Sequence, residues 1–203
     1  MKKILALLLA ALMASATLAS CGNAGNGSSG SSSVSSEADT NKESTATAEE
    51  VFDAINKAFA DKYGAIDPGI TGAINNMPAA VDDQLLEEQL GISPDLCESY
   101  KGEIAGMMTN CDMLIVVKAK EGKVEDVKAA LEAAKKAQAA QFENYPVMAN
   151  DVRIEDSKVV ENGRYVALLM VGVLTDDNES DPDFTEDVQM AEDAFNTAIE
   201  AGK

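Results

Sequence analysis

The chain has 203 residues and carries 35 Asp and Glu residues against 16 Lys and Arg residues, a formal charge of −19 at pH 7. This acidity excludes a surface that neutralises phosphates, so we expect no nucleic acid partner. The sequence contains no His, which excludes Ser-His-Asp and Cys-His catalysis, His-Glu zinc sites and His-ligated haem.

The first 20 residues predict a signal peptide. Lys2 and Lys3 form a basic start, and an unbroken apolar run extends from Ile4 to Ala14. A bilayer core about 30 Å thick needs roughly 20 helical residues to span it, so this run is too short for a stable anchor. It has the length of the apolar core of an export leader, which we expect to be removed.

The end of this leader resembles the bacterial lipobox. Leu18, Ala19 and Ser20 precede Cys21, and in that motif the Cys receives a diacylglyceryl group before the leader is cleaved. Cys21 is therefore the predicted lipidation site and mature N-terminus. Because two acyl chains anchor a protein stably, we expect attachment to the extracytoplasmic face of the cell membrane. The alternative is an ordinary signal peptide with an incidental Cys.

For residues 21–47 the sequence predicts the lipidated Cys followed by a flexible linker. The segment after Cys21 is rich in Ser, Gly, Thr and Ala, and Val34 is its one larger aliphatic residue. Such a composition buries too little apolar surface to offset the entropy of ordering. As a random coil the linker would span roughly 28 Å. The remaining residues, 48–203, are expected to form a single domain.

Two helices are predicted at the start of this domain. Thr47 and Glu50 have the spacing of a capping box, and apolar residues then recur at helical intervals until Gly64. Residues 64–80 are expected to be a loop, and residues 81–90 a second helix.

Two hairpins and two more helices follow. The Asn-Gly pair at positions 162 and 163 is a strong signal for the turn of the second hairpin. The predicted segments are strands over residues 99–107 and 113–119, a helix over 123–143, strands over 152–161 and 164–174, and a helix over 184–198. The order ααββαββα predicts an α+β fold with a mainly antiparallel sheet of about four strands. The last strand is apolar on both faces, which suggests that the two N-terminal helices cover the face opposite the other two.

Cys97 and Cys111 are the two Cys residues of the domain, and both alternatives for them stay open. An exported pair favours a disulfide. They flank a predicted strand, however, so their side chains would meet only if the chain doubled back. The other interpretation is two buried, free thiols that act as small apolar residues.

The segment from residue 176 to 187 is strongly acidic and presents the oxygen ligands that Ca²⁺ prefers. Asp176, Asn178 and Ser180 occupy the first, third and fifth positions of an EF-like loop, and Asp187 is the last. Asp181 stands where that loop requires Gly. We therefore favour a solvated loop whose acids stabilise the N-terminus of the following helix, with a calcium site as the alternative.

Several blocks of the domain are similar to a known family. The most specific are the apolar strand that ends in Lys-Ala-Lys and the Asn-Gly hairpin; the full set is Leu90 to Ile92, Tyr100, Cys111 and Asp112, Ile115 to Lys120, Gly122 and Lys123, Tyr145 and Pro146, and Lys158 to Val166. Over most of residues 47–173 the chain resembles a clostridial lipoprotein family catalogued as a domain of unknown function (DUF4358). The resemblance implies an exported, membrane-anchored protein of a Gram-positive anaerobe. It implies no activity and no functional residues.

No phosphate-binding, dinucleotide-binding or C-x-x-C motif occurs in the sequence. We therefore expect no cofactor and no enzymatic activity, and favour a binding or accessory module for an envelope protein partner or a small ligand. The alternatives are a structural component of the envelope and, less favoured, an enzyme that uses carboxylates or Lys. Such an enzyme would need a carboxylate with a raised pKa in an apolar cleft.

Overall fold

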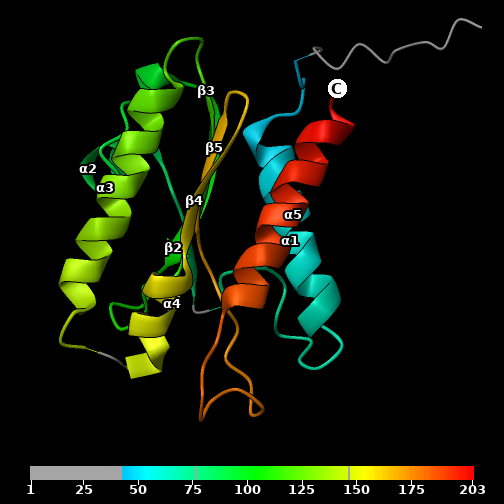
Figure 1. The fold of residues 1–203 in the computed structure, drawn as a ribbon, viewed down its shortest axis with the longest axis vertical. Coiled ribbons are helices and arrows are strands. Elements are labelled where there is room, and N and C mark those ends of the chain that lie inside the picture. Colours follow the sequence, from blue (N-terminus) through cyan, green and yellow to red (C-terminus); the bar gives the residue numbers. More distant parts are fainter. Residues whose placement is uncertain (1–42, 76, 146) are drawn as a thin grey trace, which may run out of the picture. The chain divides into compact units, whose positions relative to one another are not determined.

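An antiparallel sheet lies between two layers of helices (Figure 1). The computed structural model describes residues 43–75, 77–145 and 147–203. The predicted signal peptide, Cys21 and most of the predicted linker lie outside these residues. Of the helices that are described, none combines the length and apolar character needed to cross a membrane.

The sheet has five strands in the order β1-β2-β3-β5-β4, and each neighbouring pair is antiparallel. The strands are β1 (Pro78–Ala80), β2 (Cys97–Ala105), β3 (Met113–Ala119), β4 (Lys158–Asn162) and β5 (Tyr165–Met170). The predicted α+β fold with two hairpins is confirmed, with five strands in place of about four. β3 and β5 lie at the centre and are buried throughout, as expected for strands covered on both faces.

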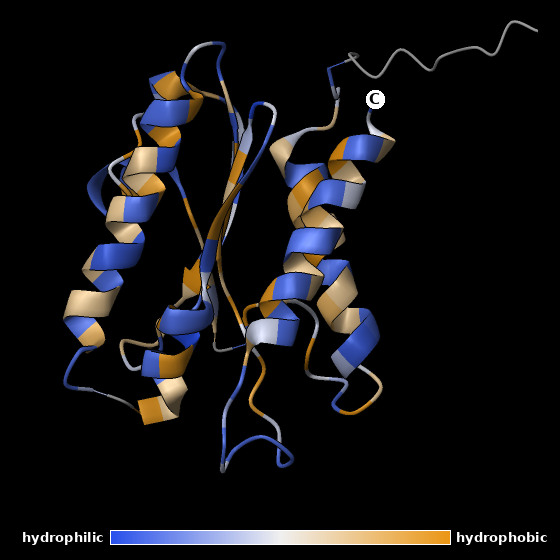
Figure 2. Cartoon of the chain, in the orientation of Figure 1, coloured by the Kyte–Doolittle hydropathy of each residue, from blue (hydrophilic) through white to orange (hydrophobic). Residues whose placement is uncertain are grey.

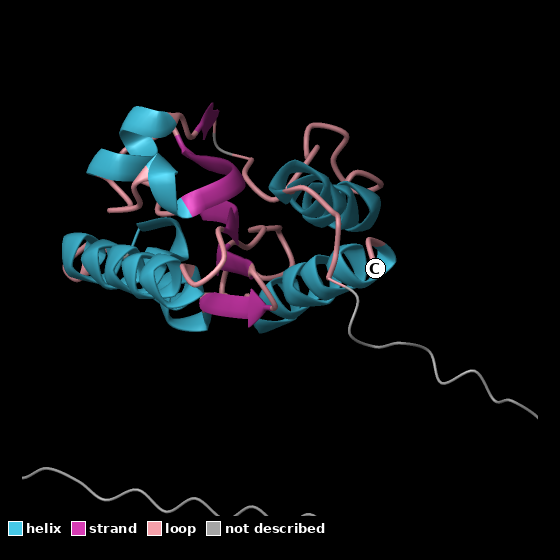
Figure 3. Cartoon of the chain, turned by 90° about the horizontal axis from the view of Figure 1, so that it is seen from above, coloured by secondary structure: helices cyan, strands magenta, loops and turns pink. Residues whose placement is uncertain are grey.

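Helices cover both faces of the sheet (Figure 3). The helices are α1 (Ala48–Tyr63), α2 (Asp83–Glu88), α3 (Val124–Phe142), α4 (Asn150–Asp156) and α5 (Thr185–Ala201), with 3₁₀ turns η1 (Pro94–Leu96) and η2 (Val147–Ala149). α1 and α5 share one core with the sheet, while α2, α3 and α4 share the other. The expectation that the two N-terminal helices lie together is therefore wrong.

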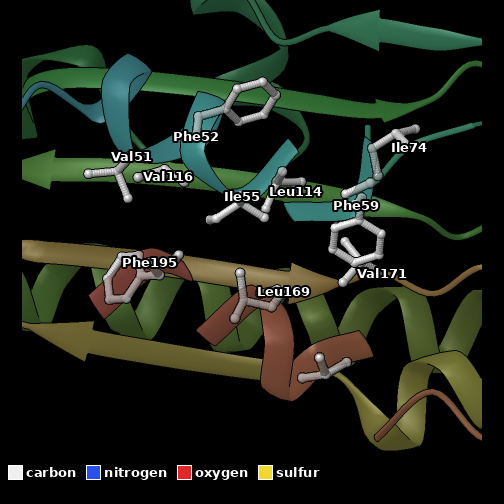
Figure 4. Close-up of a cluster of buried hydrophobic side chains, with 14 of the residues drawn as sticks. Val51, Phe52, Ile55, Phe59, Ile74, Leu114, Val116, Leu169, Val171 and Phe195 are labelled. Carbon is white, nitrogen blue, oxygen red and sulfur yellow. The ribbon is translucent and has the colours of Figure 1, made fainter. Parts of the chain in front are cut away.

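Alternation along the central strands explains the two cores, because successive side chains of a strand point to opposite faces. On β3, Leu114 and Val116 pack with α1 and α5, whereas Ile115 and Val117 pack with α3. Figure 4 shows Phe52, Ile55 and Phe59 of α1 against the first of these faces. In Figure 2 the central strands are mainly hydrophobic, while the loop that precedes α5 is hydrophilic.

The predicted start of α1 is confirmed in detail. The Glu50 amide donates to Thr47 Oγ1 at 3.2 Å, and the Thr47 amide donates to Glu50 Oε2 at 2.7 Å. These reciprocal bonds satisfy two backbone donors that a helix otherwise leaves free. The bonds that the Glu50 carboxylate accepts from the Thr47 amide and hydroxyl lower the pKa of its carboxyl group.

Three local predictions are wrong. β1 lies within the predicted loop 64–80, and α4 occupies the first half of the predicted strand 152–161, so that only Lys158–Asn162 is extended. The second hairpin turns at Gly163 and Arg164, one residue later than predicted, because Asn162 pairs with Tyr165. Gly163 has a φ of 59°, a value that favours Gly at the first central position of a type II′ turn.

The last residues of the predicted linker are part of the domain. We call residues 43–46 the N-terminal strap. Ser44 and Ala46 are buried, and the Tyr165 hydroxyl donates to the carbonyl oxygens of both, at 3.2 Å and 2.5 Å. The Thr45 amide donates to the carbonyl oxygen of Gly202 at 3.0 Å. The strap therefore joins α1 to β5 and to the end of α5.

Candidate protein-binding groove along β4

The two edges of the sheet differ in how far they are open to a partner. β1 has three residues and begins with Pro78, a residue that blocks strand pairing. β4 has five residues, contains no Pro and pairs with β5 in an unbroken register. A sheet edge without such protection presents unpaired backbone groups to other chains.

The register shows which backbone N–H and C=O groups of β4 do not bond to β5. Asn162 and Tyr165 flank a two-residue turn, so they exchange both hydrogen bonds of a closely spaced pair. Alternation along an antiparallel ladder then directs the N–H and C=O groups of Lys158, Val160 and Asn162 toward β5. Those of Val159 and Glu161 point outward, and no described residue beyond the strands bonds to them.

Helices α3 and α5 lie on either side of β4 (Figures 1 and 3), and residues of both helices form the two walls of a groove along this edge. On the α3 side, Lys128 Nζ lies 2.9 Å from Glu161 Oε2. On the α5 side, Lys158 Nζ lies 2.6 Å from Glu192 Oε2. The groove has a volume of about 650 Å³ and is lined by Lys128, Lys158, Val159, Val160, Glu161, Glu192 and Asn196.

The groove is polar, and its charges are balanced although the chain is acidic. Two Lys residues face two Glu residues across it, and the hydrogen bond to Glu161 raises the pKa of Lys128. Asn162 Nδ2 donates to Asn196 Oδ1 at 2.8 Å, closing one end of the α5 wall. The arrangement can recognise a polar extended segment, because it combines free backbone groups with side chains of both charges.

Cys97 and Cys111 lie far apart. Cys97 begins β2, and Cys111 lies beyond the other end of that strand, in the turn that leads to β3. Both are free and buried, and burial raises the pKa of the Cys97 thiol to about 11 and that of the Cys111 thiol to about 12. The structure thus holds the two residues as separate, buried thiols at opposite ends of β2.

The structure does not bring the four calcium candidates together. Asp187 lies on α5 with 3% exposure, and its carboxylate accepts from Lys62, Tyr63 and the Val173 amide. The Asn178 side chain is hydrogen-bonded to the backbone of its own loop. Among the described residues, no group of three or more Cys, Asp and Glu side chains is arranged to hold a metal ion.

Sequence reasoning missed a buried polar cluster at the end of the sheet near Cys111. Arg153 of α4 forms an ion pair with Asp112 and donates to the carbonyl oxygens of Met148 and Gly172. Its guanidinium also lies 4.4 Å from the ring centre of Phe184. All of these partners belong to the fold itself, so the cluster joins elements and offers no site for a ligand.

The same end of the sheet carries backbone strain and exposed apolar side chains. Met77, Met148 and Ala149 have φ values between 52° and 56°, a left-handed conformation that costs free energy for residues other than Gly. Met77 is 71% exposed and Met108 is 91% exposed. This end also has a pocket of about 420 Å³, which is lined by Met148, Ala149, Asp151, Val152, Leu174, Glu179 and Pro182. It is smaller than the groove of about 650 Å³ along β4, which also borders an open strand edge, and we therefore place the candidate site at β4.

One carboxylate has the property expected of an acid catalyst. Burial raises the pKa of Glu103 on β2. The nearest charges that act on it belong to Lys101 and Asp53, and Glu103 is not among the residues that line the β4 groove.

Comparison with known proteins finds similarity to a family model over part of the chain. Residues 72–171 match the model of a domain of unknown function (DUF4358), which confirms the predicted resemblance to that domain. The match includes β4 and α3, one wall of the groove, but neither α1 nor α5. No curated protein and no solved structure matches the chain.

Proposed function

We propose that this chain, which carries a DUF4358 domain over residues 72–171, is a lipid-anchored binding module that holds a protein partner in the β4 groove. The observation that carries the proposal is the open outer edge of β4, set between two walls of paired charges. Non-obligate protein interfaces are, taken as a whole, about as polar as the rest of a protein surface, so a polar groove is compatible with this role.

The sequence supports the location. A basic start, an apolar run too short to span a bilayer, and a lipobox that ends at Cys21 are the features of a bacterial lipoprotein leader. The linker that follows would allow the domain to reach partners in the envelope. In this proposal the protein is an accessory factor on the extracytoplasmic face of a Gram-positive cell membrane.

Binding is better supported than catalysis or self-assembly. Each Lys and Glu that lines the groove is already engaged with a side chain of opposite charge, and such pairing suits recognition. The carboxylate with a raised pKa, Glu103, is on another strand. A structural component built from many copies would bring together chains of formal charge −19, and this repulsion opposes self-association.

Photo-crosslinking in intact cells that produce the protein tests the proposed groove. A photoreactive residue at position 196, on the α5 wall, is compared with one at position 88, an exposed site of α2 on the other face of the sheet. We expect a protein to be captured from position 196 and not from position 88. Equal capture at both positions, or none at position 196, would contradict the proposed groove.

The lipid anchor has a separate test. Cells labelled with an alkyne analogue of palmitate should incorporate it into the wild-type chain and not into the Cys21→Ala variant, which lacks the proposed acceptor thiol. The variant should also leave the membrane fraction. A Cys97→Ala variant is the matched control, because that thiol is buried within the domain.

A further inference from the structure

We infer that the partner occupies the β4 groove with an extended segment of net positive charge, which pairs with β4 as a sixth strand of the sheet. This inference rests on the proposed function and names the chemistry of the bound segment. The bound chain would hydrogen-bond to the outward groups of Val159 and Glu161, two donors and two acceptors in all.

The backbone of β4 has the regular geometry that pairing with a further strand requires. Because the register with β5 has no bulge, the outward groups keep the regular spacing of a strand. A new strand would lie about 4.8 Å from β4. Natural proteins protect sheet edges with Pro, bulges, charged side chains or short strands. β1 at the opposite edge is short and begins with Pro. β4 has no Pro and no bulge, and its two charged side chains are paired with α3 and α5.

The walls select an extended segment in preference to a helix. A helix that docks in a groove buries an apolar face, but the rims here are formed by charged and amide side chains. Lys128 and Glu161 would face alternate side chains of the bound strand on the α3 side. Lys158 and Glu192 would face the other set on the α5 side.

Charge complementarity favours a basic segment. The two ion pairs leave the groove itself close to neutral, while the chain has a formal charge of −19. The net negative charge of the chain attracts basic segments and repels acidic ones, and electrostatic attraction of this kind acts mainly on the association rate.

A synthetic peptide provides the probe. We would use a seven-residue peptide of alternating Val and Lys with capped ends, and a counterpart in which Glu replaces Lys. The full chain is kept in mild detergent, and hydrogen–deuterium exchange is followed in the segment that contains residues 158–162. We expect the Lys peptide to slow exchange in this segment, and the Glu counterpart to have no effect.

Two variants separate backbone pairing from side-chain contacts. Glu161→Pro removes an outward N–H, whereas Glu161→Ala keeps it, and both remove the ion pair with Lys128. We expect Glu161→Pro to bind the Lys peptide at least about tenfold more weakly than Glu161→Ala, since one hydrogen bond is lost and its acceptor is left unpaired. If the Pro variant does not fold, slowed exchange in the wild-type chain still decides whether the edge is occupied.

Three results would overturn the inference: unchanged exchange in β4 when the Lys peptide is added, equal binding by both variants, or protection of β4 by chain concentration alone. The last would identify a second copy of the chain as the occupant. If crosslinking from position 196 succeeds while the peptide fails to protect β4, the result supports the binding groove and contradicts strand pairing. If crosslinking from position 196 also fails, the result contradicts the proposed function itself.

Discussion

Arg153 and Asp112 form an ion pair inside the domain, with Nε 2.5 Å from Oδ1 and side-chain exposures of 2% and 1%. The pair joins α4 to the residue before β3. Arg153 also donates a hydrogen bond to the carbonyl oxygen of Gly172, in the segment that follows β5. A buried pair of this kind contributes little over an apolar replacement, but the loss of one partner leaves a buried charge without compensation.

The Asp112→Asn variant tests this role. We expect it to lower the free energy of unfolding by about 3–5 kcal/mol, because the Arg153 charge would remain buried. Urea unfolding followed by circular dichroism measures the change. Asp61→Asn is the control, since Asp61 pairs with Lys57 on the exposed surface of α1, and its loss should cost less than about 1 kcal/mol. A loss below about 1 kcal/mol for Asp112→Asn would contradict this account.

A second buried carboxylate links α5 to α1. Asp187 accepts from the Tyr63 hydroxyl at 2.5 Å and from Lys62 Nζ at 2.7 Å. Burial and the bond to Asp187 raise the pKa of Tyr63 to about 12, from an ordinary value of 10. Folding therefore favours the neutral phenol, and the resulting stability is present below pH 10 and is lost as the pH rises toward 12.

We expect the wild-type chain to lose about 2 kcal/mol of stability between pH 10 and pH 12 that the Tyr63→Phe variant does not lose. Denaturant unfolding at several pH values measures this difference, and the absorbance of tyrosinate follows the titration itself. Tyr145→Phe serves as the control, because Tyr145 is exposed. Parallel pH profiles for wild type and Tyr63→Phe would show that Tyr63 does not carry the effect.

The buried thiols predict a simple chemical result. In the folded chain at pH 8, Cys97 and Cys111 should react slowly with a thiol reagent, because both thiols are buried and their pKa values are raised to about 11 and 12. In denaturant without reductant, both thiols should react at once. We would count the reactive thiols in the Cys21→Ala variant, in which Cys97 and Cys111 are the remaining Cys residues. The absence of these two thiols after denaturation would demonstrate a disulfide.

Relief of strain before α4 should stabilise the domain. Ala149 has a φ of 55°, and Gly adopts this conformation without the steric cost of a Cβ atom. We expect Ala149→Gly to raise the free energy of unfolding by about 0.5–1 kcal/mol. Ala133→Gly, on the exposed surface of α3, should lower it by about 1 kcal/mol. Urea unfolding of both variants provides the comparison, and destabilisation by Ala149→Gly would show that no strain is stored there.

Local signals predicted the elements that do not depend on distant contacts. The capping box at Thr47 and Glu50 marked the start of α1, and the apolar run over residues 113–119 coincides with β3. Both signals arise within a few residues of the element that they specify, through backbone capping and burial on both faces of a strand.

The missed elements depend on tertiary contacts. Val152 and Ile154 alternate with polar residues as in a strand, yet α4 forms there, and its Arg153 reaches Asp112 and Gly172. β1 is three residues long and exists through its pairing with β2. Neither interaction partner is near in sequence, so a local pattern could not indicate it.

The groove was predictable only in part. Lys158, Glu161 and Asn162 make β4 more polar than β3 or β5, which is a signal for an edge strand. Its position beside β5 and between α3 and α5 follows from the strand order, and the sequence does not reveal that order. The faces of the helices were assigned wrongly for the same reason.

If the chain is anchored to the membrane as we propose, the N-terminal strap determines where in the domain a pull on the linker acts. Its carbonyl oxygens accept from Tyr165 on β5 and from Lys118 on β3, the two central strands. Tension applied through residue 43 would therefore act on the two central strands of the sheet. It would also act on the end of α5, where the Gly202 carbonyl oxygen accepts from the Thr45 amide. No strap residue bonds to β4 among the described contacts, so a partner in the proposed groove would be shielded from drag on the proposed anchor.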